Sequence, residues 1–171
     1  MAMTFGPDGI LYAVGGCNPD PNTFECRIPP GDQNLNLLYS VQVKAGEAKP
    51  IGMFIPVGPT GAPQLFMDLA FDRHGSMFGV TTTVNPSAIP AILYHINPRT
   101  GEATQPVNLV GSNLVMGLAF GRDGNLYATD NFPFSGLYRI DMSTGFETAI
   151  AALPGTQFFS SGLELIDAAD D

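Results

Sequence analysis

The sequence is poor in basic residues. Of 171 residues, 7 are Lys or Arg and 16 are Asp or Glu, which gives a formal net charge of −9. Proteins that bind nucleic acid cluster basic side chains to displace the counterions of the phosphates, whereas the basic residues here are scattered singly. The composition therefore argues against nucleic acid as a partner.

Long hydrophobic runs are missing as well. The longest uninterrupted apolar stretches, such as residues 149–154, cover a handful of residues, whereas about 20 are needed to cross a bilayer. Residues 1–9 also lack the basic and apolar pattern of a secretory signal peptide. We therefore expect no membrane span, and no signal peptide within this chain.

A clear helical pattern is the third absence, because Gly and Pro recur throughout the chain and would interrupt helices. The chain is nevertheless 44% hydrophobic and 13% charged, with 20 Gly and 15 Pro. An apolar chain with many turn residues can pack a core and is typical of β structure rather than disorder. The length fits one domain or a piece of a larger one.

Three segments share a pattern of an apolar stretch ending in Phe, a turn ending in Gly, and a second apolar stretch with an aromatic residue. They are residues 2–13 (AMTFGPDGILYA), 68–79 (DLAFDRHGSMFG) and 117–128 (GLAFGRDGNLYA). Glycine readily adopts the positive φ that tight hairpin turns require. Each segment is therefore predicted to be a β-hairpin.

A second hairpin follows each of the first. Residues 38–47 (LYSVQVKAGE), 93–102 (LYHINPRTGE) and 137–146 (LYRIDMSTGF) each contain a strand and a Gly turn, and we expect returning strands around residues 50–54, 104–110 and 148–153. Each repeat thus has four antiparallel strands. Such a unit, repeated roughly every 40–55 residues, is typical of the blade of a β-propeller.

The predicted fold is therefore an all-β partial β-propeller in a single domain, residues 1–171. We assign residues 2–56, 65–110 and 115–154 to three blades, and residues 161–167 to the first strand of a further blade. A ring needs about 4–8 blades, and a three-blade arc would expose apolar faces. We expect either a piece of a longer propeller or a homo-oligomer that associates through its blade edges, most simply a two-fold dimer with six blades.

The consensus of the unit is G-L-A-F-x-x-D-G-x-L-Y-A, a variable loop, and L-Y-x-I-x-x-x-T-G-E. This unit resembles the degenerate propeller repeats of secreted and cell-surface bacterial proteins, a group that includes the YVTN and NHL types. The resemblance implies either an adhesion or interaction module, or a lactonase-like or lyase-like enzyme with its metal or catalytic residues at the central channel. A shared fold does not choose between these functions.

Variable loops are expected to form the binding surface, because recognition is normally built on loops that a rigid scaffold positions. The loops that leave one face of the ring are residues 15–36, 57–64, 84–90, 111–115, 131–136 and 154–160, and the face with the turn glycines Gly9, Gly75 and Gly124 is predicted to be inert. The candidate contacts for a sugar or protein partner are Asn131, Phe132, Phe134, Phe158 and Phe159. Alternatively, these aromatic residues cap the core between blades.

Two cysteines, Cys17 and Cys26, lie in the long loop of the first repeat. No partner for a zinc site accompanies them, so we expect a disulfide, with two unpaired thiols as the alternative. A disulfide would place the protein in an oxidising compartment, and we predict an extracellular or periplasmic location.

No catalytic constellation can be assembled from the sequence. His74 lies in a turn where the other repeats have Asp, and His95 lies in a variable strand position, so we interpret them as surface or packing residues. The scattered aspartates match no calcium loop, and Asp in a hairpin turn usually binds its own backbone. We therefore predict no catalytic residues, no metal and no cofactor, with a bound cation as the alternative.

The leading hypothesis is a non-enzymatic binding or structural propeller module that acts through its loop face. One alternative is a propeller hydrolase or lyase with a channel-lining site, with or without a metal, for which Asp68 and Glu164, at or beside the innermost strands, are the first candidates. A second alternative is a carbohydrate-binding module.

Overall fold

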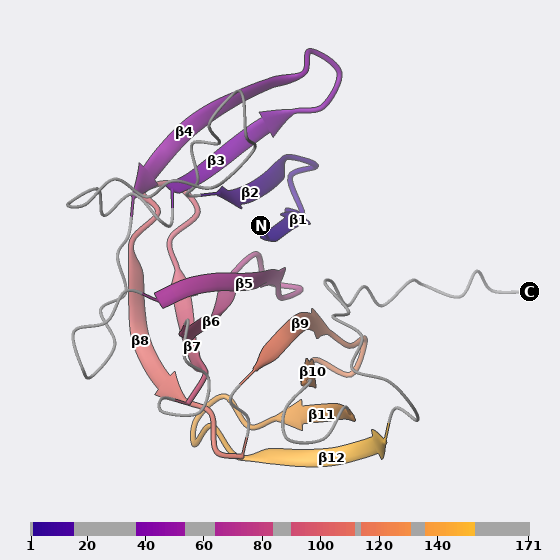
Figure 1. Ribbon diagram of the computed structural model, residues 1–171. Helices are drawn as coiled ribbons and strands as arrows, with labels where there is room; N and C mark the ends of the chain where they lie inside the picture. Colours follow the sequence, from indigo (N-terminus) through magenta and orange to yellow (C-terminus); the bar gives the residue numbers. More distant parts are fainter. Residues whose placement is uncertain are drawn as a thin grey trace, which may run out of the picture.

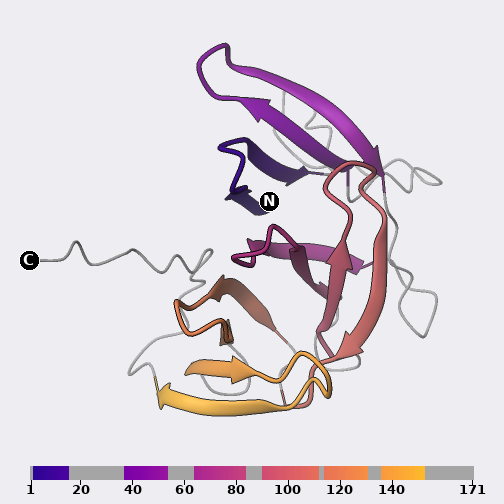
Figure 2. The same cartoon turned by 180° about the vertical axis from the view of Figure 1, so that it is seen from behind.

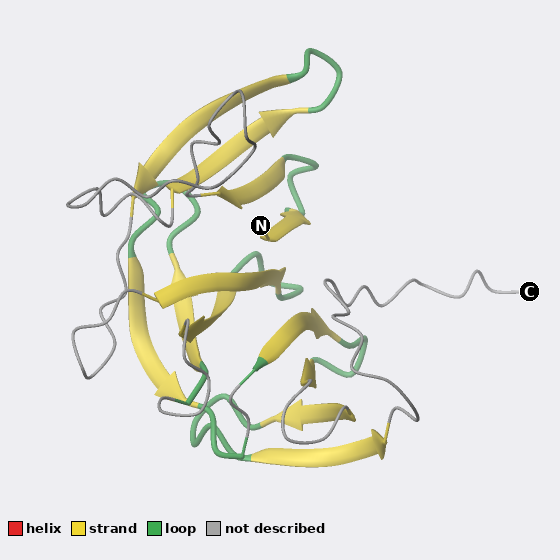
Figure 3. Cartoon of the chain, in the orientation of Figure 1, coloured by secondary structure: helices red, strands yellow, loops and turns green. Residues whose placement is uncertain are grey.

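The computed structural model describes residues 2–15, 37–53, 64–83, 90–111, 114–130 and 136–152. These residues form twelve β-strands and no helix, which confirms the all-β prediction (Figure 3). No helix among the described residues is long and apolar enough to cross a membrane. The expected strand at residues 161–167 lies outside the described residues.

The strands form three separate four-stranded antiparallel sheets, each with its strands in chain order. We refer to the sheets as blades 1, 2 and 3. Blade 1 contains β1 (Ala2–Phe5), β2 (Leu11–Gly15), β3 (Leu37–Gln42) and β4 (Glu47–Met53); blade 2 contains β5 (Gln64–Phe71), β6 (Met77–Thr83), β7 (Ile92–Ile96) and β8 (Ala103–Asn108); blade 3 contains β9 (Val115–Phe120), β10 (Leu126–Asp130), β11 (Gly136–Ile140) and β12 (Glu147–Ala152).

The blades follow one another along an arc (Figures 1 and 2). The first strands β1, β5 and β9 lie on the inner side of the arc, with β5 between the other two, and the fourth strands β4, β8 and β12 lie at the rim. This arrangement places the blades face to face, as in a β-propeller.

The first turn of blade 1 is closed by a carboxylate. Asp8 Oδ1 accepts the Ile10 amide at 3.0 Å, and Asp8 Oδ2 accepts the Tyr12 hydroxyl at 3.0 Å. Blade 3 repeats the arrangement, because Asp123 accepts the Asn125 amide at 3.0 Å and the Tyr127 hydroxyl at 2.8 Å. The interpretation of Asp as a turn residue that binds its own backbone is confirmed here.

Blade 2 closes the same turn with a different residue. His74 replaces the aspartate, and Asp72 Oδ1 instead accepts the amides of His74 at 2.9 Å and Ser76 at 2.8 Å. The position of Asp72 is a glycine in the other blades, where a Cβ at Gly6 would come within 2.6 Å of Asp8 Oδ1. Each first turn therefore has space for one carboxylate. It stands at the position of Asp72 in blade 2, and two positions later, as Asp8 or Asp123, in the other blades.

The fourth strand of every blade has an irregular register against the third. The register shifts between Leu38 and Tyr39 in blade 1, between Leu93 and His95 in blade 2, and between Leu137 and Tyr138 in blade 3. The fourth strands begin at residues 47, 103 and 147, which is earlier than expected, by three residues in blade 1 and by one in the others. In blade 1 the difference arises because Pro50 lies inside β4 instead of starting it, a position that an edge strand tolerates.

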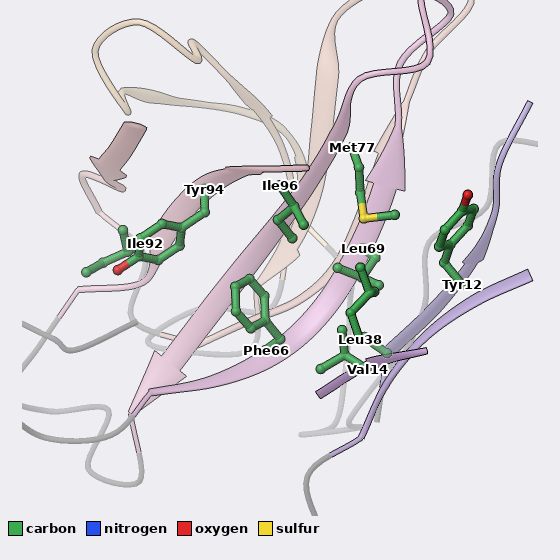
Figure 4. Close-up of a cluster of buried hydrophobic side chains, with 10 residues drawn as sticks. Tyr12, Val14, Leu38, Phe66, Leu69, Met77, Ile92, Tyr94 and Ile96 are labelled. Atoms are coloured by element: carbon green, nitrogen blue, oxygen red, sulfur yellow. The ribbon is translucent and has the colours of Figure 1, made fainter. Parts of the chain in front are cut away.

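The core consists of two clusters, one at each junction between blades. The first joins blades 1 and 2 and contains Ala2, Tyr12, Val14, Leu38, Phe66, Leu69, Met77, Ile92, Tyr94 and Ile96 (Figure 4). The second joins blades 2 and 3 and contains Ala70, Val80, Ala91, Leu93, Leu109, Val115, Leu118, Leu126, Ala128 and Ile140. Of the aromatic residues at the repeat positions, Tyr12 and Tyr94 are buried, while Tyr39, Phe78, Tyr127 and Tyr138 are half-buried.

Candidate functional site

The buried polar side chains of the described residues gather in three strands of blades 2 and 3. Four of them stand in the last three residues of β6 or the last two of β10, away from the hairpin turns, and the fifth stands within β5. They are Asp68, Thr81, Thr82, Thr129 and Asp130. We call this set the polar end of the blades. In a propeller, the loops between second and third strands emerge beside these positions.

Asp68 links two of the innermost strands. Its Oδ2 accepts the backbone amide of Leu118 on β9 at 2.7 Å, and the side chain is buried. A hydrogen bond to a charged acceptor is stronger than one between neutral groups, and a buried amide without it would be costly. Asp68, a candidate in the hydrolase hypothesis, therefore also holds blade 2 against blade 3.

Asp130 ends β10 and is 1% exposed. The register between β10 and β9 shifts between Thr129 and Asp130, and a similar shift between Phe66 and Asp68 lies in the pairing of β5 with β6. Irregularities of this kind redirect side chains and are frequent beside functional sites. Both carboxylates of the polar end thus stand at breaks in their ladders.

Tyr138 lies close enough to Asp130 for the carboxylate charge to act on its hydroxyl. Burial raises the pKa of the Tyr138 hydroxyl, and the negative charges of Asp130 and Glu147 raise it further. At neutral pH the hydroxyl therefore keeps its proton. In the same region of blade 2, the Thr81 hydroxyl donates to the Ile92 carbonyl at 3.3 Å.

The turn end of the blades differs from the polar end. His74 is exposed, as expected, and its Nε2 accepts a hydrogen bond from Arg73 Nε at 3.2 Å. Hydrogen bonds from the Asn125 side chain and amide, and from the Tyr127 hydroxyl, lower the pKa of Asp123. The carboxylates of these turns are thus occupied by their own hairpins.

His95 is a packing residue, as the strand pattern suggested. It is half-buried, and its ring packs edge-on against Phe78 with the ring centroids 5.3 Å apart. No group of three or more His, Cys, Asp or Glu within the described part of the chain is arranged to hold a metal ion.

The sequence-predicted contact residues Asn131, Phe132, Phe134, Phe158 and Phe159 lie outside the described residues, as do Cys17, Cys26 and Glu164, and they stay predictions. Thr82, Thr129 and Asp130 are candidate binding residues that no sequence motif predicts. A signal was present in the sequence. At the repeat position of Gly15, the second and third repeats have the polar residues Thr81 and Asp130, and Thr82 and Thr129 stand next to them.

No family model matches the chain, and no curated protein matches it. Among solved structures, the chain is similar to a gluconolactonase from Xanthomonas campestris, with a TM-score of 0.55 and 14% identity over 94% of this chain and 48% of that chain. The chain thus spans about half the length of that structure. The resemblance to YVTN or NHL repeats stays a prediction. The predicted fold is confirmed, because the chain forms an arc of three four-stranded β-propeller blades.

Proposed function

We propose that the protein is a β-propeller binding module that takes a polar ligand at the polar end of its blades. The observation that carries the proposal is the gathering of all five buried polar side chains of the described residues in β5, β6 and β10. Side chains on rigid strands hold their positions more accurately than side chains on loops, which suits recognition. The adjoining variable loops would add ligand-specific contacts.

The chemistry of these groups favours a neutral ligand rich in hydroxyl groups, such as a sugar. Threonine hydroxyls donate and accept hydrogen bonds, and a carboxylate such as Asp130 accepts them from ligand hydroxyls. An anionic ligand would be repelled by Asp68, Asp130 and the net charge of −9. Asn131, Phe132 and Phe134 follow Asp130 directly in the sequence, and an aromatic ring can stack on the apolar face of a sugar.

A glycan array probed with the full chain tests this function, with each hit followed by calorimetric titration. We expect Thr129→Val and Asp130→Asn to weaken the binding of a hit at least tenfold. Asp141→Asn, in the exposed second turn of blade 3, supplies the matched control and should leave binding unchanged. Failure of the array to yield any hit, or equal losses in all three variants, would contradict the proposal.

A lactone hydrolase is the second candidate. Two observations favour it: the solved structure that the chain resembles is a gluconolactonase, and two carboxylates, Asp68 and Asp130, stand at the polar end. A carboxylate can act as a general base toward water at a lactone carbonyl. Because Asp68 already accepts the Leu118 amide, Asp130 is the first residue to test.

Hydrolysis of glucono-1,5-lactone, followed with a pH indicator with and without added divalent cations, separates the two candidates. A rate above the spontaneous one that Asp130→Asn abolishes would establish the hydrolase. Binding of the sugar class without turnover would support the binding module alone.

We further propose that the protein works outside the cytoplasm, as the cysteine spacing predicts. Mass spectrometry of unreduced protein is expected to show Cys17 linked to Cys26. Two free thiols in freshly purified protein would reject both the disulfide and the location.

A further inference from the structure

Blade 1 exposes the face that blades 2 and 3 bury. We call the face that carries Met3, and its repeat equivalents Leu69 and Leu118, the leading face of a blade, and the opposite face the trailing face. Leu69 is 2% exposed and Leu118 1%, whereas Met3 is 60% exposed. Phe5 is likewise 59% exposed, while its equivalents Phe71 and Phe120 are half-buried. The leading face of blade 1 is thus built as an interface but lies uncovered.

The two junctions inside the chain show what covers a leading face. At the first, Tyr12 on the trailing face of blade 1 packs against Phe71, with ring centroids 5.3 Å apart. At the second, Phe78 of blade 2 packs against Phe120, with centroids 5.4 Å apart. Each leading face therefore receives an aromatic side chain from the second strand of the preceding blade.

At the rim, the second turn of each following blade also contacts the preceding blade. A Cβ at Gly52 on β4 would overlap the Thr100 carbonyl in the second turn of blade 2, and a Cβ at Gly145 in the second turn of blade 3 would overlap the Asn108 carbonyl on β8. In both cases the turn of one blade packs backbone to backbone on the rim strand of the preceding blade. The equivalent turn glycine of blade 1, Gly46, has no atom within 4 Å of its would-be Cβ.

Blade 3 carries the matching groups on its trailing side. The Tyr127 hydroxyl donates to Asp123 as the Tyr12 hydroxyl donates to Asp8, so the two rings are fixed in the same way. Tyr127 is half-buried. Ala151 occupies the position on β12 that Gly52 occupies on β4, because each pairs with the first Leu of the Leu-Tyr motif in the third strand, and Ala151 is exposed. Blade 3 thus offers an aromatic ring and a small rim residue where a following leading face would need them.

We propose that the leading face of blade 1 is covered by blade 3 of a second copy of this chain, and that two copies close a six-bladed ring head to tail. Such a ring has two-fold symmetry, so that the leading face of blade 1 in each copy meets blade 3 of the other and both uncovered faces are closed together. Each copy supplies three blades, and the six blades of two copies lie within the range of about 4–8 blades that propeller rings contain. The inference does not depend on the proposed ligand.

Apolar contact must drive this association, because each copy carries a net charge of −9 and the copies repel one another. Salt screens that repulsion without weakening apolar contacts. The dimer is therefore expected to become more stable as the salt concentration rises.

Sedimentation velocity of the full chain at micromolar concentration measures the association. We expect a species of twice 18.1 kDa, a dissociation constant that falls with added salt, and a loss of at least tenfold in affinity for Phe5→Glu. The matched control is Gln105→Glu, which adds the same charge on the exposed rim strand of blade 2. A monomer at all concentrations and salt levels overturns the proposal.

Cysteine crosslinking tests the head-to-tail arrangement. In a background with Cys17→Ser and Cys26→Ser, one preparation carries Phe5→Cys and the other Tyr127→Cys. A disulfide should form after mixing the two preparations and in neither alone. Crosslinking of the Phe5→Cys preparation by itself would show a face-to-face dimer, and crosslinking in no sample would show that the two positions do not meet; both results overturn the proposal.

Discussion

The third strands of blades 1 and 2 have similar sequences but very different surroundings. In β7 four of five residues are buried, on both faces of the sheet, whereas in β3 one residue of six, Leu38, is fully buried. The two strands share the motif Leu-Tyr-x-Val/Ile. The difference comes from their neighbours, because blade 2 is packed between two blades and blade 1 has one blade on its trailing face.

A blade in this protein therefore does not contain its own core. Each cluster of buried side chains is assembled from the trailing face of one blade and the leading face of the next. Stability in such an array is approximately a sum of terms within repeats and terms between neighbours. Substitutions at equivalent positions are thus expected to have effects that depend on the blade.

The largest contrast is expected between Leu69→Ala and Met3→Ala, which remove side chains of similar size from equivalent positions. Leu69 is buried between blades, so its loss should lower the free energy of unfolding by about 2–5 kcal/mol. Met3 is exposed within one copy, and its loss should change the free energy by about 0.5 kcal/mol or less. Urea denaturation of dilute protein measures both, and equal losses would show that blade 1 is as well packed as blade 2.

Removal of the Asp68 carboxylate tests the link between blades 2 and 3. Asp68→Ala leaves the Leu118 amide without its acceptor and should cost about 1.5–3 kcal/mol. Amide hydrogen exchange at Leu118 should accelerate more than exchange at Leu69, the equivalent position of β5. Unchanged protection at Leu118 would reject the structural role of Asp68.

The second turn of blade 2 and the rim strand of blade 1 approach so closely that a Cβ at Gly52 has no space. Gly52→Ala would force the Thr100 carbonyl away and should cost about 1–3 kcal/mol. Gly15→Ala is the control in the same blade, because its Cβ would meet no atom within 4 Å and its φ is not positive. Thermal melts compare the two variants, and an equal effect would contradict the close approach.

The first turns allow a smaller test of the same kind. Asp72→Gly removes the acceptor of the His74 and Ser76 amides and should cost about 1 kcal/mol. Adding His74→Asp and Phe78→Tyr rebuilds the turn of blades 1 and 3 and should recover most of the loss. Chemical denaturation of the single, double and triple variants measures the coupling, and strict additivity would show that the three positions act independently.

The smallest effect concerns the protonation of Asp123. Its pKa lies below the ordinary value because Asn125 and Tyr127 donate hydrogen bonds to the charged form. The stabilisation is present above the pKa of Asp in the unfolded chain and is lost as the pH falls through the lower folded value. Tyr127→Phe should raise the pKa part of the way, as carboxyl chemical shifts in an NMR titration would report, and a pKa that stays the same would assign the whole effect to Asn125.

The sequence predicted the blades well because each strand and turn carries its own local signal. The glycines at the turns have positive φ, as the repeat required, at Gly9, Gly75 and Gly124. These features depend on a few neighbouring residues, and a repeat displays them three times.

The candidate site was less accessible to sequence reasoning. The position of Asp68 on an innermost strand makes it a candidate, but nothing local in the sequence shows that its carboxylate accepts the amide of Leu118, 50 residues along the chain. In the sequence, Asp130 is one of several scattered acids, and no local feature distinguishes it from the others. Its burial depends on how blade 3 packs, and packing between blades has no period in the sequence.

The displaced register of the fourth strands has a consequence for how this molecule can grow. All three fourth strands are irregularly paired, and Pro50 and Pro106 remove backbone donors from β4 and β8. A straight strand from another molecule cannot continue such an edge without breaks in its ladder. Extension is thereby directed around the arc, where whole blades stack face to face, and discouraged outward, where strand-by-strand addition would lead to fibrils.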